Sequence, residues 1–244
     1  MAHLLLAAAA ALAFALSMIS AGGAALLLLP IVRWTVGMEA VAPVVTVATM
    51  NSGLSRIALL REHIRWDLVR WYLPGALIGG VLGARLFAEL VQTAESLEVL
   101  RWIVGLFLVS TLLQYRFGSR ERSFPMTRGA LTPLGLVVGT LSGLVGGLGP
   151  VLNPFFLNLG VQREELVATK AFNAFFMHLA KIGTYAAFGA LDLRMLGFGL
   201  AAGAGAVLGN WAGRGVLRRM GEKRFRTVVV WMCALSGALM LVRG

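Results

Sequence analysis

Charged residues are scarce in this chain of 244 residues. Asp, Glu, Lys and Arg make up 14% of it, against roughly 25% in ordinary soluble domains. Apolar and aromatic residues make up 58%, so the few charges cannot cover a globular surface. This composition excludes a soluble domain and a disordered chain. It predicts an all-α membrane protein whose solvent is lipid over most of its length.

Other absences narrow the chemistry. The single cysteine, Cys233, excludes an internal disulfide and a paired-cysteine metal site. The apolar stretches contain no pair of carboxylates, and the sequence has no HExxH, GxSxG or P-loop motif. We therefore expect no enzyme activity, no metal and no cofactor.

The formal net charge is +11, but the basic residues occur in short runs between apolar stretches. This pattern is typical of cytoplasmic loops under the positive-inside rule rather than of a nucleic-acid-binding surface. The runs fall within residues 56–70, 116–128 and 214–226. We expect all three to be cytoplasmic in a multi-pass protein of the inner cell membrane. The N-terminus has no charge before Arg33 and is interpreted as a retained first membrane segment.

The apolar stretches come in the same order in both halves. A short stretch is followed by a glycine-rich break, a second short stretch and three long stretches. In the first half they are residues 4–19, 24–32, 41–60, 68–91 and 97–115; in the second they are 131–145, 151–159, 166–191, 193–217 and 226–242. Gly22-Gly23 matches Gly146-Gly147, and Asp67 matches Asp192 with an offset one residue longer. The sequence predicts a first transmembrane repeat at residues 1–117, a cytoplasmic basic linker at 118–130 and a second repeat at 131–244.

The basic runs also indicate how each split pair of short stretches is threaded. If each pair formed one broken span, the last basic loop would lie outside. If each pair forms a hairpin, re-entrant or fully crossing, all three basic loops lie inside. We therefore predict two inverted-topology repeats, each with a broken or re-entrant helix pair and three long helices, and both termini outside. Small residues spaced four apart, at 75, 79 and 83 and at 201, 205, 209 and 213, predict close helix packing.

The glycine breaks are the first candidate site. Backbone N–H groups inside a membrane must be satisfied, and broken helices at matching positions in two repeats are typical of a transporter's midplane site. A helix that restarts after such a break presents a partial positive charge. Gly22, Gly23, Gly146 and Gly147 are therefore predicted to offer N–H groups to an anion.

The charged side chains inside the apolar stretches form the second candidate site. At 100° per residue, Lys170, Asn173, Met177 and Lys181 share one helical face, and His178 lies beside it. The repeat mate of Lys181 is Arg56. No buried carboxylate is available to pair with these cations, so an anionic ligand is the expected partner.

This pattern resembles the sulfite exporter TauE/SafE family of membrane permeases. The residues that carry the resemblance are Gly22-Gly23 with Pro30, Trp66-Asp67, Gly146-Gly147 with Pro154, and Thr169-Lys170 with Asn173. The resemblance implies transport of small sulfur oxyanions or organosulfonates through two inverted halves. Where the family often has a third glycine this chain has Ala24. We therefore expect the second half to contribute more of the binding.

The prediction is a transporter for a small anion, most simply sulfite, working by alternating access as one repeat moves against the other. The alternatives are an anion channel, a non-transporting scaffold or subunit, and an intramembrane enzyme. The expected partners are the anion and the bilayer, not nucleic acid. The predicted substrate-binding residues are Gly22, Gly23, Arg56, Gly146, Gly147, Asn153, Thr169, Lys170, Asn173 and Lys181, with His178 available for coupling.

Overall fold

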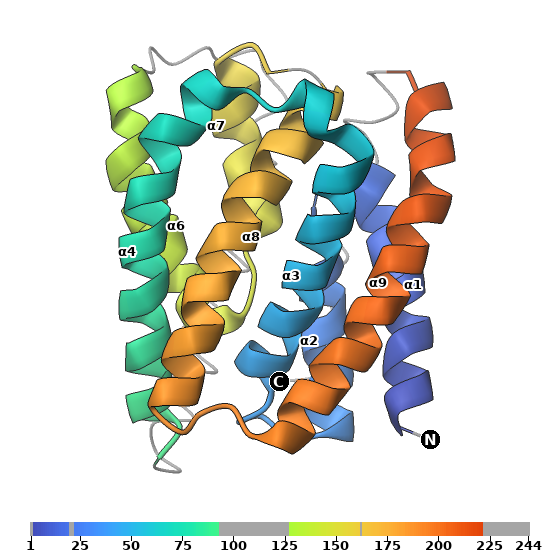
Figure 1. Ribbon diagram of the computed structural model, residues 1–244, viewed down its shortest axis with the longest axis vertical. Helices are drawn as coiled ribbons and strands as arrows, with labels where there is room; N and C mark the ends of the chain where they lie inside the picture. The colour runs from blue at the N-terminus through green and yellow to red at the C-terminus, as the bar shows by residue number, and fades with distance from the viewer. Residues whose placement is uncertain (1, 20–21, 93–126, 162, 222–244) are drawn as a thin grey trace.

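The structure is a computed structural model that describes residues 2–19, 22–92, 127–161 and 163–221 (Figure 1). These residues form helices and connections and include no β-strand, which confirms the all-α prediction. In chain order the elements are α1 (Ala2–Ile19), α2 (Ala24–Thr35), α3 (Val41–Leu60), η1 (Arg61–His63), α4 (Trp66–Leu90), η2 (Arg128–Ala130), α6 (Leu131–Val145), η3 (Gly149–Leu152), α7 (Asn153–Asn158), α8 (Arg163–Ala187) and α9 (Leu193–Arg219). The predicted long stretches 97–115 and 226–242, and residues 118–126 of the linker, lie outside the described residues.

The described residues include apolar helices of membrane-spanning length. Trp66–Leu90, Arg128–Val145 and Leu193–Leu217 are long and apolar enough to cross a bilayer. α3 and α8 have comparable lengths but carry more polar side chains. These two helices lie centrally, with α3 packed against α8 and α9, and α8 packed against α3 and α4. Each of the two more polar helices thus packs against one of the apolar ones, α3 against α9 and α8 against α4.

Both predicted glycine breaks are present. Gly22, Gly23 and Gly146 have φ angles of 144°, 102° and 98°, in the region that favours glycine. After Gly146 the chain turns back, and α7 lies near the end of the molecule from which α6 entered, whereas α1 begins at the opposite end (Figure 1). The two breaks meet inside the molecule, since a Cβ added at Gly149 would lie 3.4 Å from Gly22 Cα.

The two halves are interleaved rather than side by side. α4 packs along α6, and α1 packs along α9, so each pair joins a helix of one half to a helix of the other. A Cβ added at Gly75, Gly79 or Gly83 would lie 2.0–2.1 Å from a carbonyl oxygen of α6, and one added at Gly205 or Gly209 would lie 1.9–2.2 Å from a carbonyl oxygen of α1. Both stripes of small residues therefore allow contact at backbone level, which confirms the packing interpretation.

Candidate functional site

A partly open cavity of about 80 Å³ lies where the two glycine breaks meet α3 and α8. α3 lines it with residues spaced three and four apart, so that one face of the helix is used. α8 does the same. The polar side chains among the lining residues are Ser17, Thr49, Ser52, Arg56, Tyr72, Ser142, Lys170, Asn173 and His178. None of the lining residues is Asp or Glu, whereas Arg56 and Lys170 are among them, so the side chains that line the cavity carry a net positive charge.

Most of the predicted site residues line this cavity, and some do not. Those that line it are Gly22, Gly23, Arg56, Gly147, Lys170, Asn173 and His178. The predicted residues that are absent from its lining are Gly146, Asn153, Thr169 and Lys181. Each of these four contacts a neighbour that explains its position.

Arg56 reaches the cavity from α3 while bonded to two other helices. Its Nε donates to Asn210 Oδ1 at 2.9 Å, and Nη2 donates to Ser17 Oγ at 3.0 Å. The guanidinium lies 5.8 Å from the ring centroid of Phe14, within the range of a cation–π contact. The cation is thus held in a fixed orientation at the edge of the cavity.

Lys181 is fully buried, is not among the residues that line the cavity, and reaches the end of α6. Its Nζ donates to Ser142 O at 2.7 Å, Ser142 Oγ at 3.2 Å and Gly146 O at 3.0 Å. The sequence interpretation named an anion as the missing partner, but backbone carbonyls at a helix C-terminus, which carry partial negative charge, fill that place. These hydrogen bonds fix α8 to the second glycine break and also account for the position of Gly146.

Two more predicted residues connect helices. Lys170 Nζ donates to Asn153 Oδ1, which ties α8 to the start of α7. Lys170 is only 8% exposed, so it does not extend out to the membrane surface. Thr169 Oγ1 accepts a hydrogen bond from Arg65 N at 3.0 Å. In Asn153 and in Thr169 the side-chain oxygen thus accepts a hydrogen bond from a protein group.

Asn173 and His178 face the cavity from successive turns of α8 and are each 1% exposed. Asn173 Nδ2 donates to Thr169 O at 2.9 Å. Nδ1 of His178 lies 3.4 Å from Lys181 Nζ. An ammonium at Lys181 can only donate, so the imidazole proton is then placed on Nε2.

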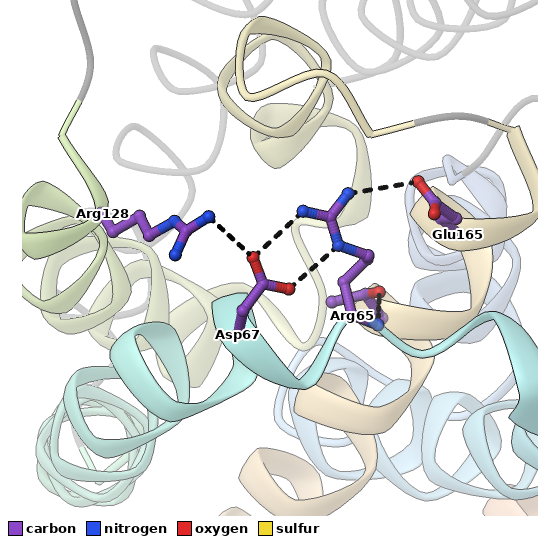
Figure 2. Close-up of polar contacts among 5 residues, drawn as sticks. Arg65, Asp67, Arg128 and Glu165 are labelled. Atoms are coloured by element: carbon purple, nitrogen blue, oxygen red, sulfur yellow. Dashed lines mark hydrogen bonds and ion pairs between the residues drawn. The ribbon is translucent and has the colours of Figure 1, made fainter.

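An ion-pair cluster that the sequence analysis did not find lies next to Thr169 (Figure 2). Arg65 Nε pairs with Asp67 Oδ1 at 2.9 Å and Arg65 Nη1 with Glu165 Oε2 at 3.5 Å, while Arg128 Nη2 pairs with Asp67 Oδ2 at 3.3 Å. The hydrogen bond to Asp67 raises the pKa of Arg65, which keeps the guanidinium charged. The cluster joins the starts of α4, α6 and α8. Only its Arg-x-Asp spacing is visible locally in the sequence.

The described residues contain no group of three or more His, Cys, Asp or Glu side chains placed to hold a metal ion. What they contain is a bundle of apolar helices packed against two more polar ones, with a cavity between two helix breaks. This fold is that of an α-helical membrane protein.

A family model described as sulfite exporter TauE/SafE matches residues 6–240 of the chain. The chain therefore belongs to this family, which confirms the resemblance noted in the sequence, and the family implies a membrane transporter for sulfur anions. No curated protein and no solved structure matches the chain.

Proposed function

We propose that this protein carries a small sulfur oxyanion, sulfite or a related organosulfonate, across the cell membrane through the cavity between the two breaks. The observation that carries the proposal is the cavity itself. It presents Arg56, Lys170 and His178, and its lining contains no carboxylate. Cationic and neutral donors without a competing acid are what an oxyanion needs as partners.

The glycines supply the second part of the binding site. Gly22, Gly23 and the first residues of α2, Ala24 and Ala25, line the cavity. α2 begins there, so its first N–H groups lack acceptors within the helix, and its dipole favours an anion. Gly147 brings the backbone of the second half to the same cavity.

The contacts between the halves support the proposed inverted repeats. α1 of the first half contacts α9 of the second, and α6 of the second contacts α4 of the first; likewise α3 contacts α9, and α8 contacts α4. Each contact thus recurs with the halves exchanged, as a two-fold relation would produce. We propose alternating access for this arrangement.

The basic segments support an orientation. The end of α3, the start of α6 and the end of α9 lie at the same end of the molecule (Figure 1). These are the described parts of the three basic runs. Under the positive-inside rule we propose that this end faces the cytoplasm of the inner membrane.

Counterflow in proteoliposomes tests the function. Vesicles loaded with unlabelled sulfite are diluted into trace ³⁵S-sulfite, and label is followed inside. A transporter that alternates access accumulates label transiently above the outside concentration. A channel equilibrates label without the overshoot, and a scaffold takes up no more than empty vesicles; either result would overturn the proposal.

A further inference from the structure

Asn173 lies on the cavity face of α8 and uses only half of its amide. Its Nδ2 donates to Thr169 O at 2.9 Å. Because a carbonyl oxygen can only accept, the amide atom that faces it must be nitrogen, which assigns the other position to Oδ1. Oδ1 is buried, and no donor among the described residues reaches it.

A buried acceptor without a donor is rare and destabilising. The nearby cations are turned to other partners: Arg56 donates to Asn210 and Ser17, and Lys170 donates to Asn153. Asn173 itself is 1% exposed and lines the cavity. A molecule in the cavity is therefore the group placed to supply the missing donor.

We propose, on the basis of the function proposed above, that Asn173 Oδ1 accepts a hydrogen bond from the transported anion and so selects a sulfur oxyanion that carries its own donor. Sulfite and sulfate dianions have only acceptor oxygens, which would place lone pairs against Oδ1. Hydrogen sulfite brings an O–H group, and an aminosulfonate brings an ammonium. Oδ1 can accept from either group while the cations of the cavity hold the oxyanion.

The size of the cavity favours the smaller of these two ligands. Its volume of about 80 Å³ is several times the ~10–15 Å³ that one water requires. That is room for a compact anion with few heavy atoms. We expect hydrogen sulfite to fit better than a longer aminosulfonate.

The first test compares two monoanions of similar size at one mildly acidic pH, where sulfite is present as hydrogen sulfite. Methanesulfonate has the same charge and no donor. The pH is held fixed because Arg56, Lys170 and His178 also face the cavity and Lys181 lies beside His178. We expect hydrogen sulfite to bind the purified protein about ten times more tightly, the effect of one hydrogen bond. Taurine against ethanesulfonate shows whether an ammonium can replace the O–H group.

A matched pair of variants assigns the effect to this residue. Asn173→Val and Asn173→Thr introduce two side chains that have the same shape as each other. Only threonine keeps an acceptor oxygen. The ratio of hydrogen sulfite to methanesulfonate affinity should fall about ten-fold in Asn173→Val and should be retained in Asn173→Thr.

The outcomes separate this inference from the proposed function. Equal affinity of the parent for the two monoanions overturns the role of Asn173, whether or not the variants fold. An unchanged ratio in Asn173→Val does the same and leaves sulfur-anion transport standing. Absence of any anion binding and any flux by the parent overturns both.

Discussion

Arg56 and Lys181 occupy matching places in the two halves, yet they are held in different ways. Each contacts a serine near the end of the first helix of its own half, Ser17 in α1 and Ser142 in α6. Arg56 also lines the cavity, whereas Lys181 donates to the carbonyl groups that end α6. These matching positions thus place a cation at the cavity in one half and a donor to backbone carbonyl groups in the other.

Both halves of the chain contribute residues to the lining of the cavity. The alanine at position 24 favoured the second half as the main binding half. In the structure the first half places Gly22, Gly23 and Arg56 at the cavity, and the second half places Gly147, Lys170, Asn173 and His178 there, so a larger share for the second half stays a prediction. Lys181, the most deeply buried cation among the described residues of the second half, contacts the break and is not part of the cavity lining.

The largest expected effect is the loss of sulfur-anion affinity in the variant Arg56→Met. Removing a cation that lines the cavity should lower sulfur-anion affinity roughly 10- to 150-fold, the equivalent of about 1.5–3 kcal/mol for a charge-assisted hydrogen bond. Isothermal titration of the purified variant measures it. Lys181→Met is the matched control, and a larger affinity loss in that control than in Arg56→Met would reverse the assigned roles.

Lys181→Met should mainly lower stability. It removes the charge-assisted hydrogen bonds to Ser142 and Gly146, which we expect to lower the free energy of unfolding by about 1.5–3 kcal/mol. The ammonium is buried and makes these bonds with protein groups, so the empty protein should melt at a lower temperature. A thermal scan in detergent without anion checks this. An unchanged or higher melting temperature would mean that burying the charge costs as much as these hydrogen bonds contribute.

The meeting point of the two breaks can be tested by a compensating pair of substitutions. A Cβ added at Gly147 would lie 2.9 Å from Ala25 Cβ, so Gly147→Ala should cost about 1–3 kcal/mol of stability through overpacking. Ala25→Gly in the same chain removes the colliding atom and should restore much of the loss. The double variant and both single variants are compared by thermal unfolding. Additive losses would show that the two breaks do not press on each other at this point.

The smallest effect is expected at the repeat-related aspartates. Asp67 joins Arg65 and Arg128, whereas Asp192 caps α9 by accepting from Met195 N at 2.6 Å. Asp67→Asn should cost about 0–1 kcal/mol, because the ion pairs are partly exposed to solvent. Asp192→Asn should be close to neutral, since Asn caps a helix as well as Asp does. A larger loss of stability in Asp192→Asn than in Asp67→Asn would contradict this difference.

Much of the site could be predicted because local spacing determines it. Two glycine pairs at matching positions located both breaks. The 100° helical period placed Lys170 and Asn173 on one face of α8 with His178 beside it, and all three line the cavity, whereas Lys181, assigned to the same face, does not. The partners of these side chains could not be predicted in the same way. The acceptors of Lys181 are mostly backbone carbonyls on another helix, which leave no pattern in the residue types.

The cluster around Arg65 illustrates the same limit. Its carboxylates come from Asp67, two residues away, and from Glu165 at the start of α8. Only folding brings the second one near. The orientation of the Asn173 amide likewise depends on a carbonyl in the previous turn, so the unused acceptor is visible only in three dimensions. The repeat boundaries and the helices at 97–115 and 226–242 stay predictions.

The backbone contacts along the two stripes of small residues determine which helices can move together as a rigid body. α4 touches α6 and α1 touches α9 so closely that a single added methyl group would collide with a carbonyl oxygen. A motion of the whole first half against the second would have to separate both of these interfaces at once. We therefore expect the rigid units to be two mixed pairs, α4 with α6 and α1 with α9, each built from one helix of either half. Opening of the cavity would therefore move these two pairs apart, along α3 and α8. The division between the moving parts would then cross the division between the two halves of the sequence.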